Sequence, residues 1–277
     1  GGAPGPLSTV DRIDYSNDTA TASVRGPLSL ARQRPIATGS ASFGYFGGGF
    51  PGPLSTVDRI DYSNDTATAS PKGPMSAARY NIAATGNQSY GYFGGGGPPQ
   101  VSTVDRVDYS NDTAIASVRG PLSVARRLLA ATGNSSYGYF GGGFPTVSTV
   151  DRIDYSNDTA TASPKGPLSA GRYALAATGN SSFGYFGGGS PGPLSTVDRI
   201  DFSNDTATAS VRGPLSLARN LLAATGNQSY GYFGGGGPGS RSTVDRVDYS
   251  NDTATASARG PLSAGRDGLA ASSSQAN

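Results

Sequence analysis

One arginine recurs at the same place in every copy of a repeated segment, and its chemistry is the clearest indication of a binding function. It stands five residues after the proline of a Gly-Pro pair, and the set comprises Arg32, Arg79, Arg126, Arg172, Arg219 and Arg266. A guanidinium offers N–H donors in a rigid fork that fits the oxygens of a carboxylate, phosphate or sulfate. Gathered at one place, these guanidiniums would hold an anionic glycan or an acidic peptide. In the alternative, each arginine binds backbone carbonyls or bridges repeats, and takes no ligand.

The composition argues against catalysis. The sequence has no Cys and no His, which removes thiolate metal sites and the commonest general base. Two Asp recur in each copy, as at Asp58 and Asp61; such carboxylates could serve acid–base chemistry or bind calcium, but we expect them to pair with arginines within or between repeats. The Gly runs, such as residues 94–97, lack the Gly-Lys-Ser/Thr ending of a phosphate-binding loop. We therefore expect no enzyme activity, no metal and no cofactor.

Net charge and hydropathy argue against two further classes. The formal net charge of +2 is too small to indicate nucleic-acid binding by bulk attraction. No stretch approaches the roughly 18 consecutive apolar residues of a membrane helix, and no secretory signal pattern is present. We expect no specific nucleic-acid partner and no membrane insertion. A secreted chain in its mature form would also lack the secretory signal pattern, because the signal peptide is removed.

An internal repeat sets the elements that must position these side chains. The segment Ser-Thr-Val-Asp-Arg begins at Ser8, Ser55, Ser102, Ser148, Ser195 and Ser242, a period of 46 or 47 residues. Such a period is typical of propellers and solenoids. Each period holds four β-rich segments, which in the third copy are Thr103–Tyr109, Thr113–Ser117, Leu128–Ala131 and Tyr137–Phe140. This pattern predicts a propeller blade. A β-solenoid is the alternative, but it would need distinct capping copies at its ends.

Three motifs resemble those of the kelch family of propellers. Tyr92-Phe93-Gly94-Gly95 is similar to the family's aromatic strand with its glycine pair. Residues 61–66 are similar to the end of its third strand and the hairpin turn that follows. Gly73-Pro74 followed by Arg79 is similar to its loop before the innermost strand. The family's outer-strand Trp is absent, and Ala69 or a neighbour takes its place. The resemblance implies a kelch-like propeller, in a setting such as a phage or bacterial surface protein, extracellular or on a virion. The copies are so alike that they indicate recent duplication, or a consensus or reconstructed design.

Residues 1–277 are expected to form one six-bladed all-β propeller with four-stranded antiparallel blades, numbered here from the channel outward as innermost, second, third and outermost strand. One blade is shared between the two ends of the chain, from residues 1–23 and 266–277. Six copies of the innermost, third and outermost strands are present, but only five of the second strand, because residues 272–277 stand where the sixth would begin. Either this blade closes imperfectly, or the chain is cut from something longer, or a neighbouring molecule donates the strand. The last option predicts self-association.

The loops that differ most between copies lie at one end of every blade, and we call this end the loop face. Besides the recurring arginines, candidate binding residues there are Arg34, Tyr80, Arg127 and Tyr173. Fifteen cations against one anion, Asp267, are expected on the loop face, and the opposite face carries ten glycosylation-type sequons and the Asp of six Asn-Asp-Thr turns. We therefore predict a charge dipole across the disc. The function predicted is a non-enzymatic scaffold or binding module whose basic face binds an anionic glycan or acidic peptide. The alternatives are a symmetric engineered or reconstructed propeller with no ligand and, less favoured, an enzyme.

Overall fold

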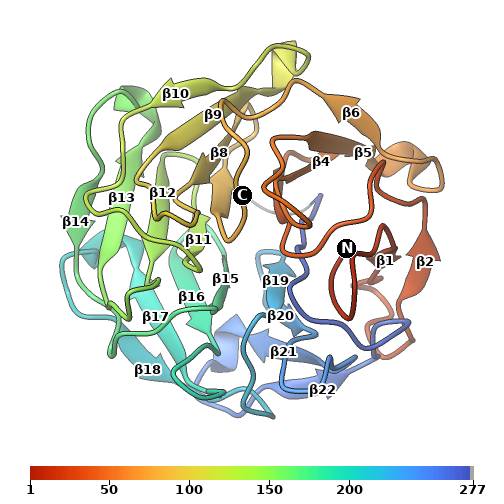
Figure 1. Cartoon of the computed structure of the whole chain (residues 1–277). Helices are drawn as coiled ribbons and strands as arrows, with labels where there is room; N and C mark the ends of the chain where they lie inside the picture. The colour runs from red at the N-terminus through yellow and green to blue at the C-terminus, as the bar shows by residue number, and fades with distance from the viewer. Residues whose placement is uncertain (275–277) are drawn as a thin grey trace.

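The computed structural model describes residues 1–274 as a ring of antiparallel β-sheets around a central channel (Figure 1). Five sheets are four-stranded blades, in the order β3 (Ile36–Gly39), β4 (Phe43–Gly47), β5 (Val57–Asp61), β6 (Ser70–Lys72); β7 (Ala83–Gly86), β8 (Tyr90–Gly94), β9 (Val104–Asp108), β10 (Ser117–Arg119); β11 (Ala130–Gly133), β12 (Tyr137–Gly141), β13 (Val150–Asp154), β14 (Ser163–Lys165); β15 (Ala176–Gly179), β16 (Phe183–Gly187), β17 (Val197–Asp201), β18 (Ser210–Arg212); and β19 (Ala223–Gly226), β20 (Tyr230–Gly234), β21 (Val244–Asp248), β22 (Ser257–Arg259). The sixth position holds β1 (Val10–Arg12) and β2 (Ser23–Arg25).

The expectation of six four-stranded blades is wrong, because the sixth sheet has only two strands. Its β1 and β2 pair in the register of a third and an outermost strand, with Val10 opposite Arg25. Leu269–Ala271 would supply the innermost strand, but no sixth Gly-Tyr-Phe-Gly segment lies between it and β1, so the ladder of hydrogen bonds cannot form there. Residues 275–277, which were expected to belong to this blade, lie outside the described residues.

The outermost strand begins later than predicted. In the third copy the predicted segment was Thr113–Ser117, whereas β10 spans Ser117–Arg119. The chain leaves β9 through a 3-10 turn, η2 (Tyr109–Asn111), where the Asp108 carboxylate accepts a hydrogen bond from the Ser110 backbone N–H at 2.9 Å. Equivalent turns are η1 (Tyr62–Asn64), η3 (Tyr155–Asn157), η4 (Phe202–Asn204) and η5 (Tyr249–Asn251). These three-residue turns are the only helices in residues 1–274, and none could cross a membrane.

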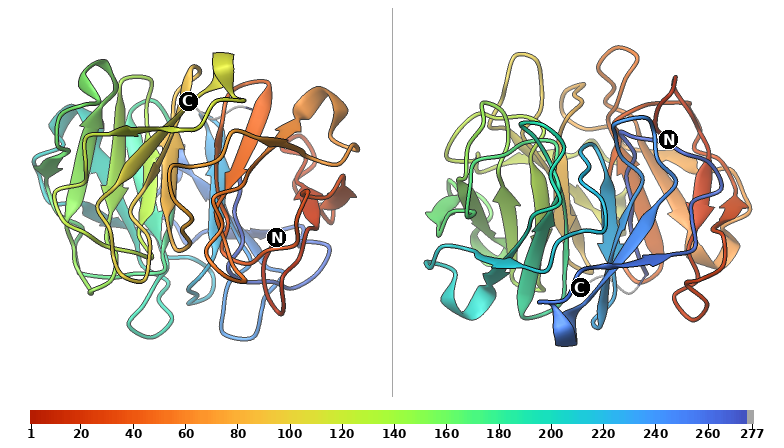
Figure 2. Two further views of the ribbon diagram at one scale, coloured as in Figure 1. Left: turned by 45° about the horizontal axis from the view of Figure 1, so that its top comes forward. Right: turned by 90° about the horizontal axis from the view of Figure 1, so that it is seen from below.

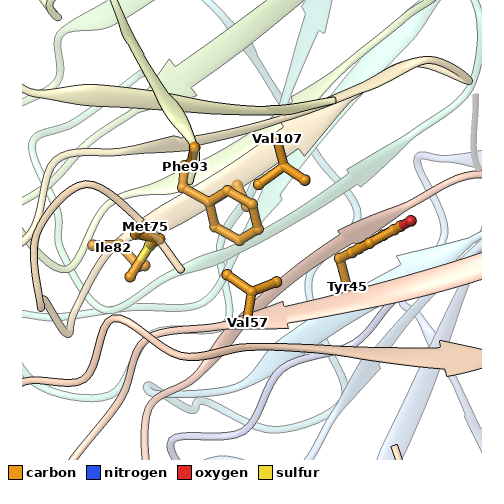
Figure 3. Close-up of a cluster of buried hydrophobic side chains, with 8 residues drawn as sticks. Tyr45, Val57, Met75, Ile82, Phe93 and Val107 are labelled. Atoms are coloured by element: carbon orange, nitrogen blue, oxygen red, sulfur yellow. The ribbon is translucent and has the colours of Figure 1, made fainter. Parts of the chain in front are cut away.

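The hydrophobic core lies between blades. One cluster joins Tyr45 on β4 and Val57 on β5 with Phe93 on β8 of the next blade, and Met75 and Ile82 complete it (Figure 3). The rings of Tyr45 and Phe93 are fully buried. Because each complete blade buries side chains against the blades beside it, its stability depends on those neighbours, and burial of each large side chain contributes about 1.5–3 kcal/mol. Side views show the strands standing between two faces from which the loops project (Figure 2).

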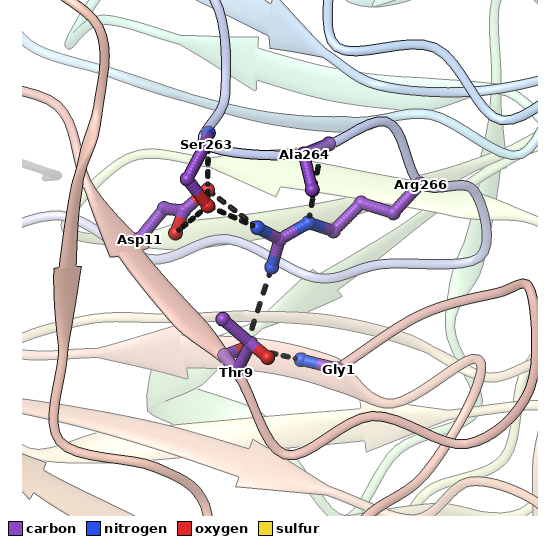
Figure 4. Close-up of polar contacts among 6 residues, drawn as sticks. All are labelled: Gly1, Thr9, Asp11, Ser263, Ala264 and Arg266. Atoms are coloured by element: carbon purple, nitrogen blue, oxygen red, sulfur yellow. Dashed lines mark hydrogen bonds and ion pairs between the residues drawn. The ribbon is translucent and has the colours of Figure 1, made fainter.

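The N-terminal segment and residues 263–266 meet at the sixth sheet (Figure 4). The Arg266 guanidinium donates to Asp11 on β1 at 2.5 Å, and the Ser263 hydroxyl donates to the same carboxylate at 2.8 Å. The α-amino group of Gly1 donates to the Thr9 carbonyl at 2.8 Å. Side-chain and backbone bonds, rather than a continuous sheet, therefore close the ring here.

Candidate binding face

The six recurring arginines are interior residues. Arg126 is fully buried, its Nη2 donates to Asp151 at 2.7 Å, and its Nη1 donates to the carbonyls of Gly142 at 2.8 Å and Thr149 at 2.7 Å. The equivalent pairs are Arg32–Asp58, Arg79–Asp105, Arg172–Asp198, Arg219–Asp245 and Arg266–Asp11. The prediction that this set holds an anionic ligand is therefore wrong, and the alternative, bonding to carbonyls and Asp, is what the structure shows.

Burial explains why each of these arginines needs an Asp. Removal from water lowers the pKa of Arg126, and the charge of Asp151 opposes that shift. An unpaired guanidinium in this position would be strongly destabilising. The pair joins the loop before the innermost strand to the third strand of its own blade. A signal for the pairing is present in the sequence, since the Asp follows the Arg by 25 or 26 residues in five copies.

The predicted charge dipole is also wrong, because a second set of cations is neutralised by the turns assigned to the opposite face. Asp112 accepts a hydrogen bond from Arg59 at 2.7 Å and lies 3.5 Å from the Lys72 ammonium, both in the preceding blade. Asp65, Asp158, Asp205, Asp252 and Asp18 have matching pairs of cations. Each short outermost strand thus ends beside the next blade's turn. The Asp of these turns is therefore tied into blade-to-blade contacts, whereas the buried pairs such as Arg126–Asp151 lie within one blade.

A ring of backbone hydrogen bonds occupies the centre of the loop face. Its members all have positive φ: Arg34 (53°), Asn81 (59°), Leu128 (56°), Ala174 (55°), Leu221 (52°) and Gly268 (57°). In five of the six members the N–H donates to the carbonyl of the neighbouring member, as from Ala174 to Leu128 at 2.7 Å and from Gly268 to Leu221 at 2.8 Å. Between Arg34 and Asn81 the side chains make the link, from Nη1 to Oδ1 at 3.3 Å. Arg34, a predicted binding residue, is therefore part of this ring.

Two aromatic pairs project from the loop face around that ring. Phe50 lies 5.8 Å from Tyr80, and Phe144 lies 5.7 Å from Tyr173, between ring centroids. The Arg127 guanidinium lies 5.0 Å from the Phe144 centroid. Phe50 is 42% exposed and Phe144 36% exposed. Two of the predicted residues, Tyr80 and Tyr173, thus belong to these pairs as half-buried rings, and a third, Arg127, lies beside one pair. The exposed members, Phe50 and Phe144, were not among the predicted residues.

Arg127 differs from the recurring arginines. Within residues 1–274 it forms no ion pair with a carboxylate, and its charge lies against an aromatic face. Asp267, the one anion expected on this face, accepts the Ser240 hydroxyl at 2.8 Å. No three carboxylates in this part of the chain come together as a metal site requires. The side chains that the loop face offers to a ligand are therefore aromatic rings and a few cations.

Comparison with known proteins supports the fold. No protein-family model and no curated protein sequence matches the chain. Among solved structures, the chain is similar to YjhT, with a TM-score of 0.72 at 12% identity over 88% of each chain. At that identity the similarity shows only the fold. The chain is a β-propeller built of internal repeats, and the kelch-like assignment stays a prediction.

Proposed function

We propose that the chain is a non-enzymatic binding module of kelch-like type, displayed at an extracellular or virion surface, and that its loop face binds an anionic glycan. The observation that carries this proposal is the group in which the exposed ring of Phe144 lies beside the half-buried Tyr173 and Arg127. The C–H face of a sugar ring packs on an aromatic face, and a guanidinium binds a sulfate or carboxylate through charge-assisted hydrogen bonds. Rigid blades hold these loop residues in place, as binding loops require.

The test is binding of the chain to immobilised heparin, a sulfated glycan, with salt used to weaken the contact. We expect Arg127→Ala and Phe144→Ala each to lower affinity about tenfold, the effect of losing one charge-assisted or aromatic contact. Arg212→Ala is the matched control. It also removes one positive charge, but Arg212 lies on an outermost strand and already forms an ion pair with Asp252.

Equal losses for Arg127→Ala and Arg212→Ala would show that the attraction is nonspecific charge and would contradict the proposed site. If the chain binds an acidic peptide through Arg127 but not heparin, the ligand class is wrong. If it binds neither, the chain is a scaffold without a ligand at this face. This scaffold without a ligand is the second candidate function, and the ion pairs that neutralise most of the cations favour it.

A further inference from the structure

The outermost strands of the ring are of two alternating kinds. Three of them, β2, β10 and β18, have the sequence Ser-Val-Arg, and we call these the valine strands. The strands between them are β6 and β14, which have the sequence Ser-Pro-Lys, and β22, which has the sequence Ser-Ala-Arg. The valine strands therefore occupy every second position around the outside of the disc (Figure 1).

The exposed aliphatic side chains follow the same alternation. The central residues of the valine strands are more than half exposed: Val24 (59%), Val118 (58%) and Val211 (60%). In the connection that leaves each valine strand, a second large aliphatic side chain is exposed: Leu30, Val124 and Leu217. The other three repeats have alanine at that position: Ala77, Ala170 and Ala264. Within residues 1–274, every exposed Val, Leu or Ile therefore lies in one of three alternate blades or in the connection that leaves it.

The proline strands show which way the backbone of the central residue points. Pro71 pairs with Asp58 in the same register in which Val118 pairs with Asp105. Proline has no N–H, and in an edge strand it stands where the N–H would face away from the ladder. In an antiparallel strand the N–H and C=O of one residue point to the same side. The N–H and C=O of each central valine therefore face outward, and in the described part of the chain no backbone bond from a loop reaches them.

The charges of the valine strands favour a second copy of the same strand as the partner. Arg119, the last residue of β10, lies 3.5 Å from Asp158, so its charge is already neutralised within the molecule. An acidic partner would therefore gain little here. Antiparallel pairing of two Ser-Val-Arg strands about their valines sets each arginine opposite a serine, so that like charges are not directly opposed. The outward N–H and C=O of one valine are also the acceptor's and donor's match for those of another.

From these observations we infer that copies of this chain associate side by side, edge to edge, through their valine strands. The central valines of two strands exchange both N–H···O=C hydrogen bonds and pack their side chains together. Exposed edge strands with free donors pair readily in this way, whereas proline blocks such pairing. One contact between three-residue strands is weak, but each copy has three of them. Association therefore extends beyond a dimer and grows with protein concentration.

This contact is different from the self-association that the sequence predicted at the sixth blade, because it uses outermost strands and needs no strand from a neighbour's core. It leaves the loop face uncovered, since the blades stand between the two faces of the disc (Figure 2). An assembly of this kind would place many loop faces side by side and strengthen binding to a repeating ligand through multivalency. The inference goes beyond the proposed glycan binding and does not depend on it, because neither the contact nor its test involves a ligand.

The experiment is sedimentation equilibrium of the full chain at rising protein concentration, which measures the average mass of the species present. We expect this mass to rise with concentration for the unmodified chain. The triple variant V24P/V118P/V211P should keep the mass of one chain throughout, because each proline removes an outward donor. The same residue already stands at the equivalent position in β6 and β14, so the blades should still fold. The reverse variant P71V/P164V adds two donor strands and should associate at lower concentration than the unmodified chain.

The matched control is V24A/V118A/V211A, which gives the valine strands the residue of β22 and keeps every N–H. It should associate more weakly than the unmodified chain but more strongly than the proline variant. A single-chain mass at every concentration for the unmodified chain would overturn the inference. So would unchanged association of the proline variant, with its fold verified by circular dichroism, because the contact would then lie elsewhere. If the proline variant does not fold, P71V/P164V decides, and no shift in its association would overturn the inference.

Discussion

The hydroxyl of Tyr92 donates a hydrogen bond to Asp158 of the next blade at 2.8 Å, and Arg106 donates to the same oxygen at 2.8 Å. Burial first, and then the hydrogen bond to Asp158, raises the pKa of Tyr92 well above its ordinary value. The phenol therefore stays protonated and remains a donor. This arrangement joins a second strand, a third strand and the neighbour's turn at one point of each blade interface.

Tyr92→Phe should lower the free energy of unfolding by about 1–3 kcal/mol, because the buried Asp158 loses a donor that water cannot replace. The matched control is Tyr90→Phe, two residues earlier on β8, since Phe43 and Phe183 occupy that position in other blades. The control should change stability by less than about 0.5 kcal/mol. Urea unfolding followed by circular dichroism measures both. Equal losses would show that the hydroxyl bond is not what stabilises the interface.

Arg126→Met should cost about 3–5 kcal/mol, because Asp151 is left charged and buried without its cation. Asp151→Leu should cost a similar amount for the converse reason. The double variant should lose clearly less than the sum of the two, and the difference is the coupling between the side chains. Additive losses in a double-mutant cycle would mean that the pair is not coupled, contrary to the 2.7 Å contact.

Stability should rise with pH between about 5 and 8 through the α-amino group of Gly1. Burial and then the charge of Arg266 lower its pKa from 8.0 to about 5 in the folded chain. In this window the unfolded chain binds a proton that the folded chain does not, so stability is fully present above pH 8 and is lost as pH falls to about 5. The effect is at most about 4 kcal/mol.

The control for this pH dependence is the chain acetylated at Gly1, which has no amine to titrate. Its amide N–H can still donate to the Thr9 carbonyl, as Gly48 N–H does to Thr56 at 3.1 Å. Unfolding free energies measured from pH 5 to pH 8.5 should therefore be flat for the acetylated chain. The same slope in both chains would assign the dependence to other groups.

Much of the fold could be predicted from the sequence because the pattern is periodic. The strand Tyr90–Gly94 and the third strand Val104–Asp108 follow from local composition and recur at each period. The outermost strand was misplaced because its Thr and Ala residues have strand-like composition but continue the turn after Asn111. The prediction for the sixth blade was wrong for another reason. Counting strand copies shows that the second strand is missing, but it does not show that the sheet keeps only two strands without it.

The surroundings of the candidate binding residues were harder to predict than the fold. Arginines after a Gly-Pro loop are typically exposed, and the burial of Arg126 depends on Asp151, which is distant in the sequence. The same limitation produced the false dipole, since Lys72 at the end of an outermost strand and Asp112 in a turn lie at positions that a single blade places at opposite ends. Only contacts between blades bring them together. Tyr173 and Arg127 were singled out because variation among copies marks positions that packing does not dictate, and their part in binding stays a prediction.

Each of the first five sequence repeats begins at a third strand and ends with the second strand of the following blade, so these repeats are each shared between two blades. Blade contacts such as Tyr45–Asp112 and Arg59–Asp112 use the same residue types at equivalent positions around the ring. Gene conversion between such copies would exchange the loops while keeping the number of blades and each blade's hydrogen bonds in register. The architecture therefore permits diversification of the loop face by recombination as well as by point mutation.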